Sequence, residues 1–527
     1  MLTPVEQFVT HAYHQKIRDG KGMHELKNKF AAQHKRGFLA NVELIEAYRG
    51  LIAKNELPED RDFWKILRKR GVRSQSGIAS ITVIMKAYPC PGKCIFCPTE
   101  PGMPKSYLSN EPAIMRAILN DFDAYRQTLN RLVSLDKSGH HTDKIDVIVS
   151  GGTFSFYPHR YQTDFTRGIF NALNHPFKKA RTLKEAQDIN ETAPNRCIGL
   201  SFETRPDHIT EKELIRMRNL GCTKIEIGVQ SLNDKVLEMN RRGHGVAETA
   251  EAIRLIRDAA YKINCHMMPN LYGSTPENDY QDFVELYANP AYRPDWLKIY
   301  PCMVVPWSQL EGIHKKGLHV PYTDEALTEL MIRVKQLVPD YTRITRLYRD
   351  IPAPTILGGS KISNLRQLVQ LRMAERGLKC VCIRCREIKG DKVYFDDLTL
   401  NVKEFDASQG REFFITYDDM KRGKLASLLR LRFSSYSLNG KKHFIKELEG
   451  AALVREVHTY GEQVRVADKE KAASQHIGLG RRMMNKAEEI ALNNGFKKIA
   501  VISGIGVREY YRKLGYVLEG TYMIKKL

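Results

Sequence analysis

"SITVIMKAY" (80–88) runs directly into "PCPGKCIFCPTE" (89–100), and this stretch decides how the fold is interpreted. Its first part is rich in β-branched and apolar residues, which predicts a strand. Its second part places Cys90, Cys94 and Cys97 in a short loop, where glycine and proline let the chain curl. Because the chain has ten cysteines and no disulfide pattern, three clustered thiols indicate a metal site.

The length and charge of the chain set its class. It has 527 residues, more than one hydrophobic core usually supports, so two or more domains are expected. No apolar run approaches the ~20 residues of a membrane helix, and the first residues lack the apolar centre of a signal peptide. We therefore expect a cytoplasmic protein without a membrane partner. The formal net charge of +22 favours nucleic acid or phosphorylated ligands.

After residue 79, short β-rich runs alternate with longer stretches of helical spacing, as in βα units around a parallel sheet. The helical stretches are 112–135, 209–221 and 246–259. The six predicted strands are 80–88, 145–152, 197–203, 224–231, 261–269 and 296–305. The fold class is therefore α/β, with a partial (β/α)6 barrel. Ligands of such barrels lie at the carboxyl ends of the strands, where the cysteine loop also falls.

The carboxy-terminal part has a different texture, with antiparallel strands, then a helix and a further strand, which predicts an α+β domain. A boundary is expected near 390–408. The predicted divisions are a basic segment 1–75, a barrel 76–375, a cysteine-containing linker 376–400 and the α+β domain 401–527.

Three cysteines suit a metal site in which one coordination position is not filled by the protein. A structural zinc ion normally has four protein ligands, whereas a four-iron four-sulfur cluster on three cysteines keeps one iron open. The spacing after the first strand resembles that of the radical S-adenosylmethionine superfamily, which implies such a cluster and this cofactor. Zinc with a distant fourth ligand is the alternative. Gly151 and Gly152 in "SGGTF" (150–154) resemble the superfamily's glycine motif and would contact the cofactor, although a Gly-Gly pair alone is only a turn.

A second motif lies in "QHIGLGRRMMNKAEEIALNNGFKKIAVISG" (475–504). Gly478 and Gly480 open a predicted helix whose free N–H groups, beside Arg481, can cradle a pyrophosphate. Together with the strand 453–461 and "GVREYYRKLGY" (506–516), the motif resembles the acetyl-coenzyme A fold of the GNAT acetyltransferases. Tyr510 and Tyr511 are either packed aromatics or phenols that act in hydrogen bonding or proton transfer.

Both domains, their order, "HMMPNLYGSTPENDYQDF" (266–283) and "YRDIPAP" (348–354) resemble the family of the Elongator catalytic subunit in a stand-alone prokaryotic form. The resemblance covers about residues 70–527. Eukaryotic members have a longer spacing between the first two cluster cysteines. The resemblance implies that Cys90, Cys94 and Cys97 hold the cluster, and that Cys380, Cys382 and Cys385 bind a structural zinc. Cys302 and His266 are candidates for the fourth zinc ligand.

The same resemblance implies the residues of the acetyl-coenzyme A site, of which Lys144 comes from the barrel and is expected to act in catalysis with Tyr510 and Tyr511. The residues expected to contact this cofactor are Lys144, Glu456, Val457, His458, Thr459, Gly478, Leu479, Gly480, Arg481 and Tyr511.

The family makes 5-carboxymethyluridine at the wobble position of tRNA. The resemblance implies that an adenosyl radical removes hydrogen from the acetyl methyl group, and that the resulting carbon radical adds to carbon 5 of uridine. Expected partners are the tRNA anticodon stem-loop and an electron donor, with a homodimer as one assembly. The basic run 61–73 would bind phosphates, or is a solvated helix face. The alternatives are a protein lysine acetyltransferase with a structural iron–sulfur domain, and a tRNA-binding scaffold.

Overall fold

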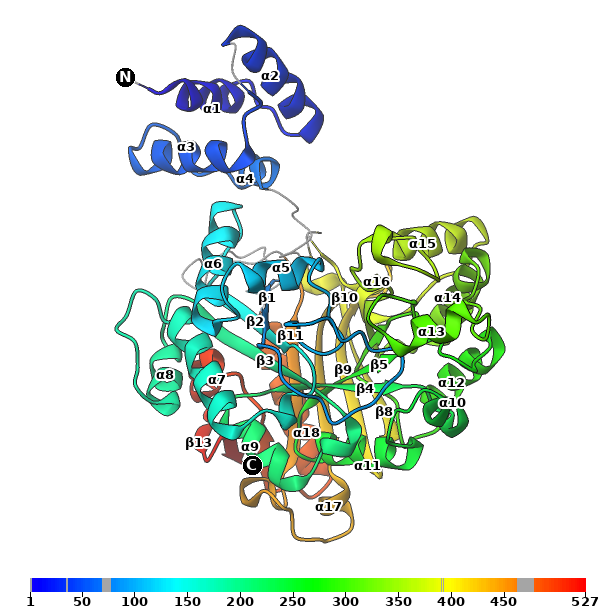
Figure 1. Ribbon diagram of the computed structural model, residues 1–527. Helices are drawn as coiled ribbons and strands as arrows, with labels where there is room; N and C mark the ends of the chain where they lie inside the picture. The colour runs from blue at the N-terminus through cyan, green and yellow to red at the C-terminus, as the bar shows by residue number, and fades with distance from the viewer. Residues whose placement is uncertain (1, 35–36, 69–76, 390, 392, 462–477) are drawn as a thin grey trace.

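The computed structural model describes residues 2–34, 37–68, 77–389, 391, 393–461 and 478–527 (Figure 1). The end of the predicted basic run, 69–73, and the start of the second motif, 475–477, lie outside the described residues.

Four amino-terminal helices form a unit at the top of Figure 1, with a core of its own that includes Phe8, Tyr48 and Phe63. The unit contacts the second helix after β1, where the Arg49 guanidinium lies 2.7 Å from an Asp136 carboxylate oxygen. The four helices are α1 (Pro4–His14), α2 (Gly20–Gln33), α3 (Asn41–Ala53) and α4 (Arg61–Leu67).

The central sheet is parallel and keeps the strands in chain order, which confirms the barrel-type α/β class. Buried parallel strands are covered on both faces, so they are nearly continuously apolar and easy to predict. All six predicted strands form, and a seventh, β7, joins after β6. The strands are β1 (Ala79–Ile84), β2 (Lys144–Ser150), β3 (Arg196–Thr204), β4 (Lys224–Gln230), β5 (Lys262–Met267), β6 (Trp296–Ile299) and β7 (Arg343–Arg346).

Helices cover the outside of this sheet. The single helix predicted over 112–135 is wrong, because Asp121 and Phe122 adopt φ of +52° and +55° and Asp123 caps a new helix. Among the described residues, no helix is both long and apolar enough to cross a membrane. The helices are α5 (Pro112–Ile118), α6 (Ala124–Lys137), α7 (His159–Leu173), α8 (Leu183–Asn190), α9 (Glu211–Asn219), α10 (Asp234–Met239), α11 (Val246–Asp258), α12 (Pro276–Ala288), α13 (Gln309–Lys315), α14 (Asp324–Leu337) and α15 (Leu365–Glu375).

A second sheet is mixed, with the order β13-β14-β12-β11-β10-β9-β8. β8 to β11 are antiparallel neighbours, whereas β12 runs parallel to β11 after the intervening helix α18. The strands are β8 (Leu398–Ala407), β9 (Gly410–Asp419), β10 (Lys424–Phe433), β11 (Ala452–Thr459), β12 (Lys498–Val501), β13 (Val517–Glu519) and β14 (Tyr522–Lys526). The helices are α16 (Ile383–Arg386), α17 (Ser435–Leu438), α18 (Leu479–Asn493) and α19 (Arg508–Arg512), with the 3₁₀ helix η8 (Ile505–Val507).

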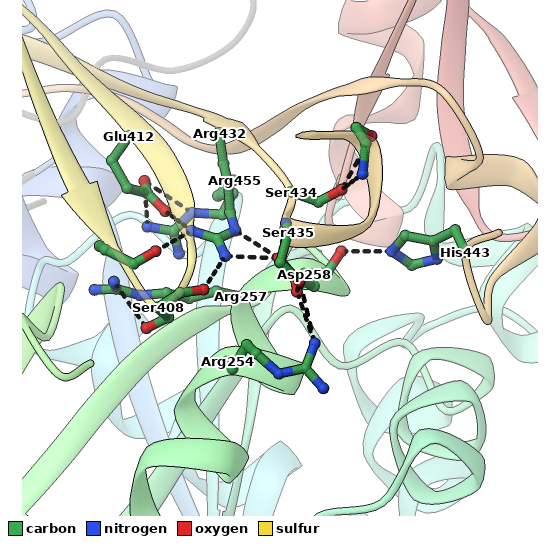
Figure 2. A network of polar contacts seen from close by, with 12 residues as sticks. Arg254, Arg257, Asp258, Ser408, Glu412, Arg432, Ser434, Ser435, His443 and Arg455 are labelled. Carbon is green, nitrogen blue, oxygen red and sulfur yellow. Dashed lines mark hydrogen bonds and ion pairs between the residues drawn. The ribbon is translucent and has the colours of Figure 1, made fainter. Parts of the chain in front are cut away.

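The mixed sheet lies against the amino ends of the barrel strands, and the contact is a buried network of charges (Figure 2). Arg432 of β10 reaches Asp258, the last residue of α11, at 2.6 Å. Arg455 of β11 lies 2.6 Å from Asp295, just before β6, and 2.9 Å from Glu412 of β9. All these side chains are buried, so each charge depends on a partner for compensation. This network fixes the position of the mixed sheet relative to the barrel.

Candidate functional site

The cysteine loop follows β1 at the carboxyl end of the parallel sheet, as predicted from its position. Its backbone is held by the segments that follow β4 and β6. The Ile95 N–H donates to the Asn240 carbonyl at 3.2 Å, and the Leu310 N–H donates to the Ile95 carbonyl at 2.9 Å. These hydrogen bonds fix the loop over the end of the barrel before any metal binds.

Two buried arginines lie near Cys94: Arg205 follows β3, and Arg242 follows the helix after β4. The distances from the Cys94 sulfur to Arg242 Nη1 and Arg205 Nη1 are 3.6 and 4.0 Å. A hydrogen bond with Cys97 and the charges of both arginines lower the pKa of Cys94 to about 5, against the opposing effect of burial. Neither Arg205 nor Arg242 was predicted from the sequence, since an arginine in a loop gives no signal that it will be buried.

The residues around the loop fit an anionic metal cluster. The Arg242 Nε is buried and lacks a hydrogen-bond partner in the described part of the chain. The Arg205 guanidinium lies directly against Gly92, where any Cβ would overlap it. The buried Arg242 guanidinium favours a negative centre nearby, and a cluster held by three thiolates carries net negative charge. Arg205 contributes less, because its guanidinium already pairs with the Asp207 carboxylate at 2.8 Å. We conclude that the site suits the predicted iron–sulfur cluster.

Gly151 and Gly152 lie beside the same loop, immediately after β2. Their φ values of +127° and +111° favour glycine, and a Cβ at Gly151 would come within 3.0 Å of the Met85 nitrogen. The next residue, Thr153, places its hydroxyl 3.5 Å from the Cys90 sulfur. The structure therefore places the glycine pair beside the cysteines, although the two segments are far apart in the sequence.

Below the loop, a chain of polar side chains runs through the barrel. Lys298 pairs with the carboxylate of Glu226, and His266 Nε2 lies 3.1 Å from the same group. The other ring nitrogen of His266 is 3.5 Å from Glu203, which accepts a hydrogen bond from the Tyr107 hydroxyl at 3.0 Å. Burial alone would raise the pKa of Glu226, but Lys298 and His266 lower it well below its usual range. The inner face of the barrel therefore carries charge.

The second motif forms the start of α18. Gly478, the N-cap of α18, adopts φ of +75° and has no side chain that could cap the helix, so the first helical N–H groups are suited to an anion. A Cβ at Gly480 would lie 2.6 Å from the Tyr510 hydroxyl, so this phenol lies over the first helical turn. Tyr511 instead packs inside the core of the mixed sheet. Of the two tyrosines, Tyr510 is the one that the structure brings to the glycines.

The predicted segment Glu456–Thr459 lies beyond the part of β11 that pairs with β12. β12 pairs only with Ala452–Val454 of β11, so its ladder ends before this segment. The Glu456 carboxylate accepts a hydrogen bond from Arg430 Nε at 2.9 Å and lies 3.9 Å from Lys262 of β5. This acid therefore belongs to the contact with the barrel. Val457, His458 and Thr459 are half-buried.

Lys144 is the first residue of β2, at the amino end of the barrel. It pairs in register with Arg196 of β3, against which Gly506 of η8 packs directly. Burial lowers the pKa of Lys144. The structure thus places Lys144 one strand away from the segment that leads to Tyr510, on the side of the barrel that faces the mixed sheet.

Cys380, Cys382 and Cys385 form a compact trio at and before α16, with all three sulfurs within 4.8 Å of one another. That spacing is close to the value of about 4 Å expected for thiolates on one tetrahedral zinc ion. Hydrogen bonds from Cys380 and Cys382 lower the pKa of Cys385, and Lys335 and Arg366 add to the effect. Arg366 Nη1 is buried without a hydrogen-bond partner among the described residues, which fits an anionic centre.

The suggestion that Cys302 or His266 completes this trio is wrong. His266 bonds inside the barrel as described above, and Cys302 packs with Cys94 and Leu310 below the first cysteine loop. Within the described part of the chain, no fourth histidine, cysteine or carboxylate joins the three thiols.

The parallel sheet and its three-cysteine loop define a radical S-adenosylmethionine enzyme. A family model for the Radical SAM superfamily matches residues 87–286, and one for the Radical_SAM C-terminal domain matches residues 294–375. The chain also belongs to the family of tRNA uridine(34) acetyltransferases and Elongator complex protein 3, as the following relatives show.

The relatives match over nearly the whole chain. The tRNA uridine(34) acetyltransferase of Methanocaldococcus infernus is 42% identical over 479 residues, which is 88% of each protein. The human Elongator complex protein 3 is 37% identical over 525 residues, or 96% of this chain and 93% of the relative. The solved structure of the Methanocaldococcus infernus Elp3 with an N-terminal deletion superposes with a TM-score of 0.74 at 39% identity, over 86% of this chain and all of that one.

Proposed function

We propose that this protein is a tRNA carboxymethyluridine synthase that acts on the wobble uridine with acetyl-coenzyme A as the carbon source. The observation that carries the proposal is that the cysteine loop and the mixed sheet are attached to the same barrel. The cysteine loop lies at the carboxyl ends of the strands, while the mixed sheet, which carries α18, contacts their amino ends. The names of its relatives support uridine 34 of tRNA as the target.

A reduced four-iron four-sulfur cluster on Cys90, Cys94 and Cys97 and its bound S-adenosylmethionine supply a radical that can take hydrogen from a methyl group. The chain's own residues bind and orient the partners. Arg205 and Arg242 neutralise the thiolate side, and the backbone of Gly151 and Gly152 is available to the cofactor. Burial of the loop between the barrel segments excludes water from reactive species.

Acetyl-coenzyme A is proposed to bind at α18, with the pyrophosphate on the N–H groups of Leu479, Gly480 and Arg481. The acetyl end would lie beside Val457, and Tyr510 would hydrogen-bond near the thioester. Lys144 would contribute from the barrel. Sharing of the cofactor would require a fixed relative position of the two domains, which the buried ion pairs between them provide.

The radical generated at the cluster and the acetyl group of acetyl-coenzyme A are proposed to react inside the barrel. Asn264 of β5 pairs in register with Glu226, and both polar atoms of its side chain are buried without a described partner. An amide with an unused donor and acceptor can bind a polar substrate group, such as the edge of a uracil ring. Phosphates of the anticodon stem-loop would bind basic residues of the amino-terminal unit, in the cytoplasm.

The compact trio Cys380, Cys382 and Cys385 is proposed to bind zinc as a structural centre. α16 connects the two sheets, because the Ile383 N–H donates to the Thr342 carbonyl and the Ile388 N–H donates to the Leu425 carbonyl, at 3.0 and 3.1 Å. A metal here would stabilise the connection between the domains.

The test is an anaerobic reaction of reconstituted protein with tRNA, S-adenosylmethionine, acetyl-coenzyme A and dithionite, with tRNA nucleosides measured by mass spectrometry. Cys94→Ser is expected to abolish 5-carboxymethyluridine. Cys222→Ser is the matched control, since that buried thiol is not part of the cysteine loop and donates to the Lys224 carbonyl at 3.2 Å, which a hydroxyl can also do.

Product formation by Cys94→Ser would overturn the proposal. Acetylation of a lysine peptide without reductant, unaffected by this substitution, would instead support the lysine acetyltransferase alternative. Binding of tRNA without any product from the unaltered protein would support the scaffold.

A further inference from the structure

Four buried polar atoms inside the barrel have no hydrogen-bond partner among the described residues. They are the Ser201 hydroxyl, the Oε1 atom of Glu226 and both polar atoms of the Asn264 side chain. These three side chains belong to residues that are at most 1% exposed. A buried donor or acceptor that stays unpaired lowers stability, so a group of four such atoms indicates a site for a polar ligand.

The unpaired atoms lie near one another because their strands are neighbours. Ser201 of β3 pairs in register with Lys224 of β4, and Glu226 of β4 pairs in register with Asn264 of β5. Side chains two residues apart on a strand share a face, so Asn264 lies on the inner face together with His266. The four atoms therefore form one cluster, which we call the inner polar cluster.

The charges beside the inner polar cluster balance. The Lys224 ammonium lies 3.5 Å from Asp146 Oδ2 and 3.9 Å from the unpaired Glu226 Oε1. Lys298 is the second cation, and it pairs with the other oxygen of Glu226. Because two ammonium groups face two carboxylates, an added anion or cation would lack compensation. A neutral ligand with both donors and acceptors fits better.

The order of donors and acceptors matches one kind of base edge. Against the effect of burial, Lys298 and His266 hold the pKa of Glu226 well below its usual range, so its free oxygen can only accept. Glu226 lies between two donors, since Lys224 precedes it on β4 and the Asn264 amide is opposite it on β5. Uracil presents an N–H donor between two carbonyl oxygens, which completes this pattern.

Other ligands of the proposed reaction match the pattern less well. Cytosine has an acceptor at the ring nitrogen where uracil has its N–H, and this acceptor would face the Glu226 carboxylate. The acetyl thioester has a carbonyl oxygen but no donor, so it would leave the free oxygen of Glu226 unpaired.

We propose that Lys224, Glu226 and Asn264 recognise the N3 edge of the wobble uracil and exclude cytidine at this position. Glu226 accepts the N3–H, while Lys224 and Asn264 donate to the two carbonyl oxygens, as enzymes do that bind an extruded base. Trp296 pairs in register with Asn264, and its ring centre lies 4.1 Å from the Lys224 ammonium, which it holds in place. The inference rests on the proposed function, which does not say how other bases are excluded.

The experiment uses two tRNA transcripts that differ only in uridine or cytidine at the wobble position. The reconstituted protein reacts anaerobically with an equimolar mixture of both, and mass spectrometry measures the two carboxymethyl nucleosides. The unaltered protein should favour uridine by at least about 100-fold. Asn264→Leu should lower this ratio by about tenfold or more, because one donor of the pattern is lost. Cys265→Ser, the next residue of β5 on its opposite face, is the control and should keep the ratio.

Melting temperatures give a readout that does not depend on activity. Asn264→Leu removes two unpaired atoms, so it should melt at the same temperature as the unaltered protein or higher. Asn190→Leu is the matched control and should melt at a lower temperature. The Asn190 amide donates to Asn174 Oδ1 and accepts the Cys197 N–H, both at 2.8 Å. Equal losses in the two variants would show that Asn264 is bonded to ordered water, and would overturn the inference.

Fluorescence anisotropy of labelled anticodon stem-loops measures the same preference without any reaction. The unaltered protein should bind the uridine stem-loop more tightly than one with 3-methyluridine, which lacks the N3–H, and Asn264→Leu should reduce this difference. An unchanged preference in Asn264→Leu would overturn the inference even if carboxymethyluridine forms, and so would equal binding of both stem-loops by the unaltered protein. A failure of the proposed function would instead appear as no carboxymethyl product, with the difference in binding still present.

Discussion

Asp282 is a buried carboxyl group on α12 that holds the loop after β4. Its Oδ2 accepts hydrogen bonds from the Ser231 hydroxyl at 2.5 Å and from the Leu232 N–H at 2.9 Å. Burial raises the pKa of Asp282 to about 6, above its ordinary value of 3.8, against the effect of these bonds. The folded protein thus holds this proton more tightly than the unfolded chain does. The stabilisation is fully present below about pH 4 and is lost as the pH rises through 6.

Asp282→Asn is therefore expected to gain stability relative to the unaltered protein as the pH rises from 4 to 7, by about 2–3 kcal/mol. The amide keeps an acceptor for Ser231 and Leu232 but does not ionise. Melting temperatures across this pH range measure the difference. Glu238→Gln, at an exposed position of α10, is the surface control. A difference in melting temperature between Asp282→Asn and the unaltered protein that stayed constant from pH 4 to 7 would contradict this prediction.

The cysteine trio near α16 allows a metal prediction. Purified protein should contain about one zinc ion per chain, measured by mass spectrometry of metals, and Cys385→Ser should lower this content severalfold because three thiols share one ion. Chelation should lower the melting temperature of the unaltered protein but not that of the variant. Cys265→Ser, a buried thiol of β5, is the control. Full zinc content in Cys385→Ser would place the metal elsewhere.

At the residue level, spacing predicted which cysteines belong together because ligand motifs are local in sequence. It could not predict Arg205 and Arg242, since these reach Cys94 across 111 and 148 residues of sequence. It also could not choose between Tyr510 and Tyr511. Neighbours on a short helix point to different sides, and only the fold decides which one faces the glycines.

Among the elements, the segment Gly504–Val507 joins the mixed sheet to β3. A Cβ at Gly504 would overlap the Ile198 carbonyl, which is backbone and cannot rotate away. Gly504→Ala is therefore expected to destabilise the protein by about 1–3 kcal/mol, as overpacking does. Gly312→Ala is the control, because no atom lies within 4 Å of a Cβ there and alanine suits the interior of α13. Urea unfolding compares the two, and equal stabilities would contradict the predicted overlap.

Elements with a continuous apolar pattern were predictable, whereas elements shaped by tertiary contacts were not. β7 consists of "RITR", which looks like a loop, yet Arg343 pairs with Glu387 at 2.7 Å and its neighbour Ile344 is buried. β8 is an edge strand with mostly exposed side chains, so it lacks the alternation of a half-buried strand. The break between α5 and α6 depends on two residues in the left-handed conformation, which no periodicity indicates.

At the scale of the whole molecule, the buried charges between the barrel and the mixed sheet make the domains depend on each other. Arg432→Met leaves the Asp258 charge buried with fewer partners, so it should cost about 3–5 kcal/mol. Combining it with Asp258→Asn should cost less than the sum of the two single changes, because the pair is removed together. Melting temperatures of the four proteins give this coupling.

The control for this cycle is Asp188→Asn, which breaks the pair with Lys184 on α8 at a side chain that is 50% exposed. An exposed pair contributes at most about 1 kcal/mol. Strict additivity of Arg432→Met and Asp258→Asn would show that this contact does not hold the domains together.

The network in Figure 2 also sets a rule for protein engineering. A hybrid that takes its barrel from one relative and its mixed sheet from another keeps this contact only if the two parents together supply both the acids and the arginines. Functional chimeras must therefore exchange Asp258 and Asp295 together with Arg432 and Arg455, as one inherited set.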